Sequence, residues 1–385
     1  MQIALITREF PPEIYGGAGV HVAHLSQELQ KHLALDVYCM GDARPGAQSF
    51  KIASGNNFAF EVMRTNIDIG KAVSSGKYDL VHSHTWYANL AGQLSAMALG
   101  VPHIITAHSL EPMRPWKREQ LGAGYEISCQ IEKQAFESAS KIIAVSFGMK
   151  KDIEEHYTNV NPLNIQVIHN GIDPSVYKPT HDPEVLLKYG IALDTPIVLF
   201  VGRITRQKGL QHLLNAVKNI EAHAQIVIAA SSPDDEEIGN SIQSQILHLQ
   251  ETSTHSLIWI NQHIPRSDLL VLYSEATVFV CPSIYEPLGI VNLEAMACQT
   301  PVVASSVGGI PEVVAHDVTG LLVKYDPNNT EEFESNLANH INTLLSNPVL
   351  AREMGMRARD HVVDNFDWAR IARNTIELYQ SVVSP

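Results

Sequence analysis

The chain has 385 residues, a length that favours two domains over a single hydrophobic core. It carries 41 acidic and 27 basic side chains, giving a net charge of −14, so electrostatic capture of nucleic acid or of an anionic membrane surface is unfavourable. We therefore expect neither nucleic acid nor a membrane surface as a partner. Any bound anion must be held by a local group of cations.

The cysteines and the first residues indicate a reducing compartment. Four cysteines are widely spaced and form no CxxC or zinc-like pattern, which favours free thiols. The segment MQIALITREF begins with a short apolar strand and has neither a charged leader nor a cleavage site. No apolar run approaches the roughly 20 residues of a membrane span. The expectation is a cytoplasmic protein without a membrane span.

Short β-branched runs alternate with amphipathic segments through both halves of the chain. Near-continuous hydrophobic strands are typical of parallel sheets that are buried on both faces. The pattern predicts an α/β protein with two Rossmann-like, doubly wound domains, each binding ligands at the carboxyl ends of its strands. The predicted strands are 3–7, 35–40, 79–84, 103–108, 141–146, 165–170, 196–202, 224–230, 256–261, 277–283, 301–306 and 320–323.

A proline-rich segment separates the two predicted domains. Residues 170–184 contain three prolines, which interrupt any regular element. We expect an N-terminal domain over 1–177 and a C-terminal domain over 178–365. The final helix, 366–385, could pack on either domain. The sequence leaves oligomeric state open, and a homo-oligomer is one possibility.

The segment YEPLGIVNLEAM, residues 285–296, places two acids around a predicted helix start. Glu286 precedes Pro287 and is therefore expected in the turn after strand 277–283, with Pro287 at the first helical position. Glu294 lies one turn into the helix, and its side chain points back toward the helix start. The pair is predicted to flank one pocket; alternatively, Glu286 caps the helix and Glu294 is a surface acid.

The start of the same helix is predicted to bind a phosphate group. The N–H groups around Gly289, Ile290 and Val291 have no partner within the helix and lie at its positive end. The segment GRITRQKGL, residues 202–210, follows strand 196–202 and adds Arg203 and Lys208, two cations suited to a diphosphate. The alternative for these two cations is a solvated basic loop.

A second glycine-rich turn follows the first strand. The segment YGGAGVH, residues 15–21, leads into a helix and contains Gly16, Gly17 and Gly19. It lacks the GxGxxG spacing of a dinucleotide-binding turn, so a simple tight turn is an alternative to a phosphate site.

Histidines gather at the ends of two predicted strands. His82 and His84 share one face of strand 79–84, and His108 is the last residue of strand 103–108. A metal site is conceivable, but no carboxylate or cysteine spacing completes it. We expect no metal and assign these histidines hydrogen-bonding or structural roles.

A basic cluster lies in the segment EPMRPWKREQLGAGYE, residues 111–126. Arg114, Lys117 and Arg118 surround Trp116 in an otherwise acidic chain. The cluster is a candidate contact for a phosphate or a sugar, and a solvated surface is the alternative.

The ensemble of segments resembles the retaining family 4 glycosyltransferases, which have two facing Rossmann-like domains (the GT-B fold). Two segments, REFPPEIYGGAGVHV and HSLEPMRPWKREQLGAGYE, are similar to the group of short bacterial glycogen synthases and α-maltose-1-phosphate synthases. The matching motifs, in family order over most of the chain, are YGGAGVH, VHSHTW, TAHS, HNGID, GRITRQKG, YEPLGIVNLEAMA and TPVVASSVGGIPE.

The resemblance implies roles on the donor side, with the active site in the cleft between the domains. Arg203 and Lys208 would bind the donor diphosphate and stabilise it as the leaving group. Glu286 would bind hydroxyls of the donor sugar, and Glu294 the nucleotide ribose. The remaining phosphate or sugar contacts implied for the donor are Gly16, Gly17, Gly289, Ile290 and Val291.

On the acceptor side, the resemblance places His108 beside the reacting sugar as a catalytic residue. Arg114, Lys117, Arg118 and His84 are the expected acceptor contacts. Asn170 and Asp173 would lie near the cleft, with roles that the resemblance does not define.

Two departures from the family pattern affect these expectations. Gln299 stands where the family commonly has a glycine at a helix end or turn, so it bears on local geometry more than on catalysis. Arg8 and the glycine turn replace the KTGG-like loop of the longer bacterial glycogen synthases, so a long glucan is a less secure acceptor.

The implied reaction is transfer of an α-glucosyl group from a nucleotide diphosphate glucose, such as ADP-glucose, to glucose 1-phosphate, without a metal or other cofactor. The alternative acceptor is the end of an α-1,4-glucan, as in glycogen synthesis; a related family 4 transferase with another sugar is a further alternative. Two other classes stay open. Glu286 and Glu294 could serve a glycoside hydrolase, and the fold could serve a nicotinamide-dependent oxidoreductase or a non-catalytic nucleotide-binding module.

Overall fold

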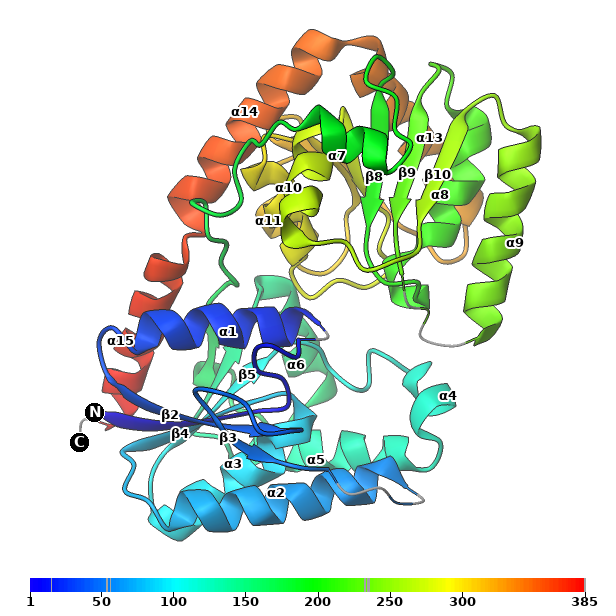
Figure 1. Cartoon of the computed structure of the whole chain (residues 1–385). Helices are drawn as coiled ribbons and strands as arrows, with labels where there is room; N and C mark the ends of the chain where they lie inside the picture. Colours follow the sequence, from blue (N-terminus) through cyan, green and yellow to red (C-terminus); the bar gives the residue numbers. More distant parts are fainter. Residues whose placement is uncertain (15, 53–54, 56, 232, 234–235, 384–385) are drawn as a thin grey trace. The chain divides into compact units, whose positions relative to one another are not determined.

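The structure is a computed structural model that describes residues 1–14, 16–52, 55, 57–231, 233 and 236–383. The chain forms two compact units (Figure 1). Unit 1 combines Met1–Gly171 with Trp368–Pro385, and unit 2 is Ile172–Asp367. Each unit has its own parallel sheet with helices on both faces, so the predicted α/β class with two Rossmann-like units is confirmed.

The sheet of unit 1 has the strand order β3-β2-β1-β4-β5-β6-β7, and every neighbouring pair is parallel. All six strands predicted in this half are present. The short edge strand β3 was not predicted, because three residues without an apolar run give no periodic signal. The bounds are β1 Gln2–Thr7, β2 Ala34–Met40, β3 Gln48–Phe50, β4 Leu80–His84, β5 His103–Ala107, β6 Lys141–Ala144 and β7 Ile165–Val167.

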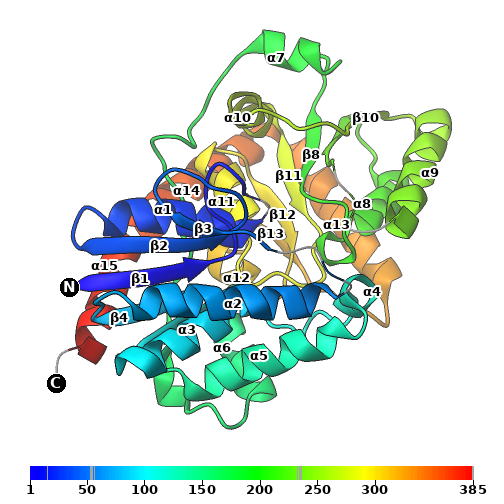
Figure 2. The same cartoon turned by 60° about the horizontal axis from the view of Figure 1, so that its bottom comes forward.

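Two layers of helices cover this sheet. Helices α2, α3 and α5 lie along one face, and α1 and α15 lie together on the other (Figures 1 and 2). The final helix α15 therefore belongs to the core of unit 1, where Trp368 and Tyr379 pack with Ile3 and Leu25. The bounds are α1 Gly17–Leu29, α2 Phe58–Ser74, α3 Trp86–Leu99, α4 Lys117–Leu121, α5 Gly124–Ser138, α6 Phe147–His156 and α15 Trp368–Val383, with the short 3-10 helix η1 at Pro162–Asn164.

The sheet of unit 2 has the strand order β10-β9-β8-β11-β12-β13, again with parallel pairs throughout. Each of its strands lies within a predicted range. The bounds are β8 Ile197–Val201, β9 Gln225–Ala229, β10 Ser256–Ile260, β11 Val278–Cys281, β12 Val302–Ser305 and β13 Gly320–Val323.

Helices also cover both faces of the second sheet. Residues of α8, α9 and α13 form one large apolar core with the strands, while α10, α11 and α14 pack together on the other side (Figure 1). The bounds are α7 Pro183–Lys188, α8 Leu210–Ala216, α9 Glu236–Thr252, α10 Arg266–Glu275, α11 Ile290–Ala297, α12 Ile310–Val313, α13 Thr330–Ser346 and α14 Pro348–Asn365, with 3-10 helices η2 at Arg206–Lys208 and η3 at Val217–Asn219.

Each sheet has one point where the strand order reverses. In unit 1 it lies between β1 and β4, and in unit 2 between β8 and β11. Loops that leave the carboxyl ends of such strands diverge to opposite faces, and the space between them is the usual ligand site of an open α/β sheet. The residues that follow these four strands are therefore the first place to look for a functional site.

The start and end of α11 correct one prediction and confirm another. Pro287 is not at the first helical position, because α11 begins at Ile290 and Gly289 precedes it with φ +97°. Only a glycine adopts that conformation without strain. Gln299, just after the helix, has φ +66°. This confirms the prediction of a turn at the helix end, where the family commonly has a glycine.

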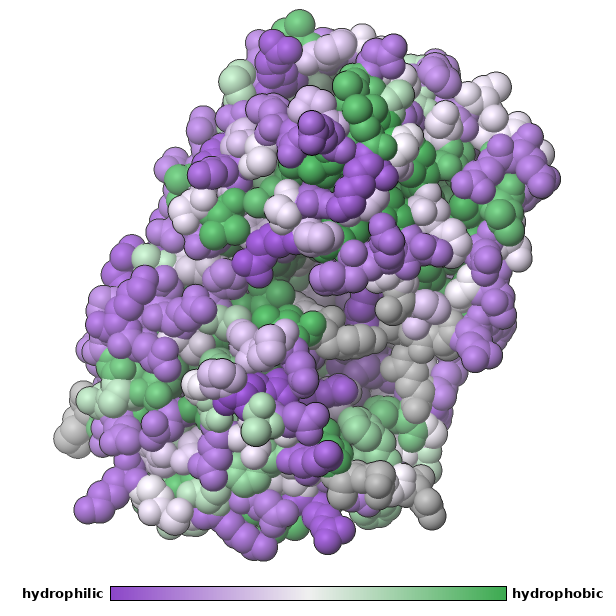
Figure 3. Space-filling view, in the orientation of Figure 1, coloured by the Kyte–Doolittle hydropathy of each residue, from purple (hydrophilic) through white to green (hydrophobic). Residues whose placement is uncertain are grey.

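The surface shows many charged and polar side chains. Hydrophilic residues cover much of the visible face of both units, with hydrophobic residues scattered between them (Figure 3). Among the described residues, no helix combines the length and the apolar character that crossing a membrane requires.

Candidate active site

A buried ion pair joins the two loops at the switch point of unit 2. Lys208, beyond β8, donates to Oε2 of Glu286, beyond β11, with 2.6 Å between the atoms. Only 17% of the lysine side chain and 9% of the glutamate side chain are exposed. Burial alone would lower the pKa of Lys208, but the Glu286 carboxylate raises that pKa above its ordinary value. The solvated-loop alternative is therefore wrong for Lys208.

The backbone around Glu286 depends on two glycines. Gly308 has φ +52°, and a Cβ at this position would collide with the carbonyl oxygen of Glu286. The N–H of Gly309 donates to that same oxygen over 3.0 Å, and Ser283 Oγ donates to the side-chain Oε2 over 3.2 Å. Glu286 lies in the predicted turn. It does not cap α11, which has no side-chain cap, so the capping alternative is wrong.

Arg203 lies close enough to Lys208 for its charge to act on the lysine. Among the influences on the pKa of Lys208, after burial and the Glu286 carboxylate, the charge of Arg203 acts to lower it. Thr205 fixes the loop between them, because its hydroxyl accepts from the N–H of Lys208 over 3.2 Å at the start of η2. The structure thus brings together the two cations that the sequence placed after β8.

The start of α11 carries a residue that sequence reasoning missed. The first-turn N–H groups of a helix have no partner inside it, as expected for Gly289, Ile290 and Val291. Asn292 has no exposed surface, and neither its Oδ1 nor its Nδ2 has a hydrogen-bond partner among the described residues. A Cβ on Gly289 would lie 2.6 Å from Nδ2 of Asn292. A buried amide without partners is costly and marks a place where a polar ligand group can bind.

Glu294 is held by two phenols. Tyr177 donates to its Oε1 over 3.0 Å, and Tyr273 donates to its Oε2 over 2.9 Å. Burial raises the pKa of Glu294, and these two hydrogen bonds act against the rise. Glu294 is therefore not the surface acid of the alternative interpretation. Its expected contact with a ribose stays a prediction, and each oxygen already has one protein donor.

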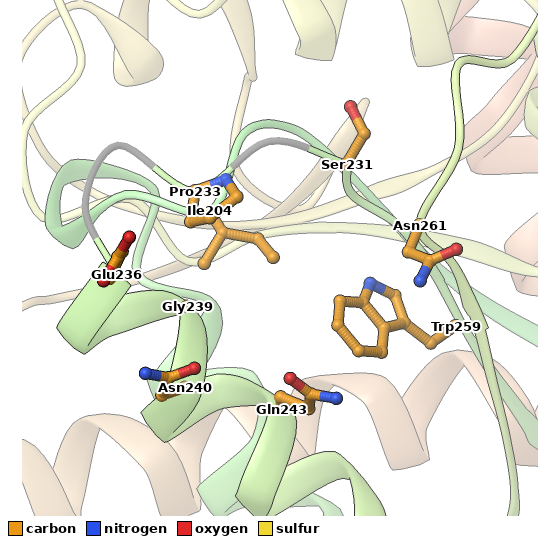
Figure 4. A pocket seen from close by; sticks show the side chains of 9 residues that line it. All are labelled: Ile204, Ser231, Pro233, Glu236, Gly239, Asn240, Gln243, Trp259 and Asn261. Carbon is orange, nitrogen blue, oxygen red and sulfur yellow. The ribbon is translucent and has the colours of Figure 1, made fainter.

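A cavity of about 490 Å³ lies at the carboxyl ends of β8, β9 and β10. The indole of Trp259 forms one wall, and residues of α9 form another (Figure 4). The indole is fixed, because its N–H donates to the carbonyl of Ala230 over 2.9 Å. A flat ring surrounded by amide side chains can stack on and hydrogen-bond a heterocyclic base. The lining residues are Ile204, Ser231, Pro233, Glu236, Gly239, Asn240, Gln243, Trp259 and Asn261.

The glycine turn of unit 1 contacts a carboxylate. The N–H of Gly16 donates to Oε2 of Glu9 over 2.9 Å, and a Cβ on Gly19 would lie 2.6 Å from the same atom. Gly17 begins α1. Tyr15 of the quoted segment lies outside the described residues. An acid at the positive end of a helix is favourable, so a phosphate at Gly16 would compete with Glu9.

Three histidine side chains form a cluster: His84 at the end of β4, His108 directly after β5 and His21 on α1. Nδ1 of His84 and Nε2 of His108 are 3.0 Å apart and share a hydrogen bond, and Nδ1 of His21 contacts Oδ1 of Asn170 over 2.8 Å. Burial lowers the pKa of all three histidines, which keeps their rings neutral. His84 has no exposed surface, so its contact in this structure is with His108. His82 makes different bonds, to Tyr379 and Thr106.

The same cluster has the geometry of a possible metal site. One nitrogen from each of His21, His84 and His108 lies within 4.8 Å of the others, and neutral imidazoles are good ligands for transition metals. His21, on α1, was not part of the sequence-based hypothesis, because its spacing from the other two gives no motif. The expectation that the protein needs no metal stays a prediction.

The basic cluster is built on a buried acid. Glu111 has no exposed surface; its Oε1 accepts from Arg114 and lies 3.7 Å from Nζ of Lys117. Its Oε2 accepts from Ser128 over 2.9 Å. Arg118 is separate: 64% of its side chain is exposed, and it pairs with Glu126 over 2.5 Å. The structure thus joins Arg114 and Lys117 and leaves Arg118 at the surface.

Known proteins match nearly the whole chain. Residues 15–176 match the family described as Glycosyltransferase Family 4, and residues 183–361 match Glycosyl transferases group 1. The chain is 47% identical to alpha-maltose-1-phosphate synthase of Mycolicibacterium smegmatis and 43% identical to that of Mycobacterium tuberculosis; each match covers 99% of this chain and 100% of the relative. Sucrose-phosphate synthase from Thermosynechococcus elongatus shares the fold, with a TM-score of 0.82 at 24% identity over 99% of both chains.

These matches decide between the classes that the sequence left open. The relatives that match over their full length are named as synthases, which excludes the glycoside hydrolase and the nicotinamide-dependent oxidoreductase. The non-catalytic alternative also falls, because those relatives are enzymes. The chain belongs to the family 4/group 1 glycosyltransferases, nucleotide-sugar-dependent enzymes with the GT-B fold.

Proposed function

We propose that the protein is a retaining glucosyltransferase that moves an α-glucosyl group from ADP-glucose to glucose 1-phosphate, giving α-maltose 1-phosphate for α-glucan and glycogen synthesis. The observation that carries the proposal is the pair Arg114 and Lys117 on buried Glu111, in a chain 47% identical to a protein named for that product. A cationic site suits an acceptor that carries a phosphate. A neutral glucan end has no need of it.

In this proposal, unit 2 handles the donor. When the bond between glucose and the diphosphate breaks, negative charge develops on the leaving ADP. Lys208 and Arg203 neutralise that charge, together with the N–H groups of Ile290 and Val291 at the start of α11. Groups that are already oriented before the reaction lower the barrier most effectively. No metal is needed in this scheme, because the two cations supply the positive charge.

The remaining donor contacts follow the same assignment. Glu286 binds hydroxyls of the donor glucose, Glu294 the ribose, and the cavity beside Trp259 the base. Lys208 orients Glu286 through their ion pair, so the lysine serves both the leaving group and the sugar. Gly16 and Gly17 bind phosphate or sugar oxygens once Glu9 yields its contact with Gly16.

Unit 1 handles the acceptor and the reacting sugar. The acceptor hydroxyl attacks from the face that ADP leaves, which retains the α configuration, and its proton passes to an oxygen of the departing phosphate. His108 stays neutral and hydrogen-bonds the reacting sugar, and His84 holds the ring of His108 in place. Arg114 and Lys117 bind the acceptor phosphate.

The proposal is tested by incubating the purified protein with ADP-glucose and either glucose 1-phosphate or glycogen. We expect a disaccharide phosphate whose new linkage is α, identified by NMR, and little incorporation into glycogen. Transfer to glycogen at a rate that glucose 1-phosphate does not alter would instead support a glucan-elongating synthase. Repeating the assay with UDP-glucose and with a chelator tests the donor base and the absence of a metal requirement.

A further inference from the structure

The switch point of unit 1 holds two cations that the proposed donor chemistry does not use. Arg8 directly follows β1, and Tyr87 lies in the first turn of α3, just beyond β4. β1 and β4 are paired neighbours on either side of the reversal in strand order. Lys117 reaches the same ring from the segment beyond β5. Three loops at the carboxyl edge of one sheet thus converge on Tyr87.

The geometry around Tyr87 is specific. The guanidinium carbon of Arg8 lies 4.1 Å from the centre of the Tyr87 ring, and the ammonium nitrogen of Lys117 lies 5.6 Å from it. Arg8 is also 5.6 Å from the ring of Phe58, of which 39% is exposed. Cation–ring contacts hold these charges in place without using their N–H groups.

The hydrogen-bond donors of both cations are available. No hydrogen bond joins the guanidinium of Arg8, or the ammonium group of Lys117, to another described residue. Lys117 approaches Glu111 only to 3.7 Å, although just 14% of its side chain is exposed. A largely buried ammonium group without a hydrogen bond is unfavourable, and an anionic ligand would remove that cost.

The local charge is positive. Arg8, Arg114 and Lys117 face the carboxyl groups of Glu111, Glu9 and Glu132. Burial raises the pKa of Glu132 to about 8, so Glu132 keeps its proton near neutral pH and three cations face two charged carboxylates. Glu111 already accepts from Arg114 and Ser128. Burial, and then repulsion from Arg114 and Arg8, lower the pKa of Lys117 to about 8, against the opposing attraction of Glu111. A bound anion would attract all three cations and so offset the repulsion between them.

We propose that Arg8 and Lys117, gathered at the ring of Tyr87, bind the phosphate group of a sugar phosphate, with Phe58 and Tyr87 available to the sugar ring. Arg114 completes the site, and Glu111 positions Arg114 and Lys117. Arg118 has no part in it, because it pairs with Glu126 at the surface. The identity of the sugar phosphate as the glucosyl acceptor rests on the proposed function; the binding site itself does not.

The first test measures binding without catalysis. Titration calorimetry with α-glucose 1-phosphate, and separately with inorganic phosphate, is carried out on the wild type, Arg8→Ala, Lys117→Met and the matched control Arg118→Ala. We expect Arg8→Ala and Lys117→Met to weaken glucose 1-phosphate about 10- to 100-fold, as loss of a charge-assisted contact should, and Arg118→Ala to change it less than 3-fold. ADP should bind all four proteins alike, which excludes an effect on the donor site.

The second test measures turnover and separates the two proposals. In Arg8→Ala, the KM for glucose 1-phosphate should rise about 10- to 100-fold with kcat within about 3-fold. If the wild type forms no α-maltose 1-phosphate but Arg8→Ala still loses glucose 1-phosphate binding, the proposed function fails and the site stands. If turnover is present and only Arg118→Ala raises the KM, the site assignment is overturned. Unchanged binding in both Arg8→Ala and Lys117→Met, with thermal stability preserved, would equally overturn it.

Discussion

The charged groups at the two switch points differ in whether other protein groups pair with them. In unit 2, the charged groups satisfy one another: Lys208 bonds to Glu286, and Glu294 accepts from two tyrosines. In unit 1, the neutral rings of His84 and His108 bond to each other, and Arg8 and Lys117 keep their N–H donors unused by described residues. The difference agrees with the donor site proposed in unit 2, whose charged groups are already paired, and with the proposal that an anion binds the cations of unit 1.

The backbone supports this contrast. Glu286 depends on a glycine, Gly308, whose absent side chain allows contact with the carbonyl of Glu286. In unit 1, Glu111 is held by side chains and by the fold of its own loop, with Arg114 and Ser128 as donors. Pre-organised groups cost no reorganisation during the reaction, whereas a site built on side-chain contacts tolerates adjustment when a ligand binds.

The largest effect is expected when the ion pair of unit 2 is broken. Lys208→Ala removes the positive charge proposed for the leaving group and leaves Glu286 without its ion-pair partner, so kcat should fall at least about 10²- to 10³-fold. The matched control is Lys218→Ala, an exposed lysine of the same unit, which should keep wild-type kcat. Steady-state rates and melting temperatures check both variants. A folded Lys208→Ala protein with kcat within 3-fold of wild type would contradict the leaving-group role.

The next effect concerns the glycine behind Glu286. Gly308 and Gly190 both have positive φ, of +52° and +73°, but a Cβ at Gly190 would meet nothing within 4 Å. Gly190→Ala should therefore cost only about 1 kcal/mol of unfolding free energy, and Gly308→Ala about 2–3 kcal/mol more because of the collision. Denaturant unfolding measures both. Equal losses for the two variants would show that the turn at Glu286 adjusts freely.

Much of the fold and part of the site could be predicted from the sequence. The buried strands were found because parallel strands are apolar over their whole length, and Lys208 and Glu286 were placed at the same sheet edge because each follows such a strand. Glu111 and Asn292 could not be assigned, since a polar residue in a loop or first helical turn looks the same in sequence whether it is buried or exposed. Arg118 was grouped with Lys117 because the two are adjacent in sequence. Adjacent residues of a helix point in different directions, however, and Arg118 pairs with Glu126 instead.

A smaller, pH-dependent effect is expected from a buried acid of unit 1. Burial, reinforced by the charge of Glu111, raises the pKa of Glu132 to about 8, although Tyr157 donates to it over 2.5 Å. The folded state therefore holds a proton that the unfolded chain releases above about pH 4.5. This contribution to stability is complete below that pH and is lost as pH rises through about 8.

Glu132→Gln removes the titrating proton and keeps an oxygen that can accept from Tyr157. The melting temperature of the wild type should thus fall more steeply between pH 5 and 9 than that of Glu132→Gln, because only the folded wild type loses a bound proton in this range. Parallel thermal melts at several pH values give the result. Curves that stay parallel across the range would mean that Glu132 is ionised in the folded protein.

The smallest effect is expected at Gln299, and it should be a gain. Gln299 has φ +66° at the end of α11, and its exposed side chain forms no hydrogen bond with a described residue. A non-glycine residue in this conformation destabilises the folded state by roughly 1–2 kcal/mol. Glycine removes this strain, but its greater freedom in the unfolded chain offsets part of the gain in stability. Gln299→Gly should therefore stabilise unit 2 by about 0.5–1 kcal/mol in denaturant unfolding. Gln299→Ala is the matched control, because it removes the side chain but keeps the backbone strain, and it should show no gain. If both variants were stabilised equally, the glutamine side chain and not the backbone conformation would be the source of the destabilisation. The backbone of the turn after α11 would then be unstrained.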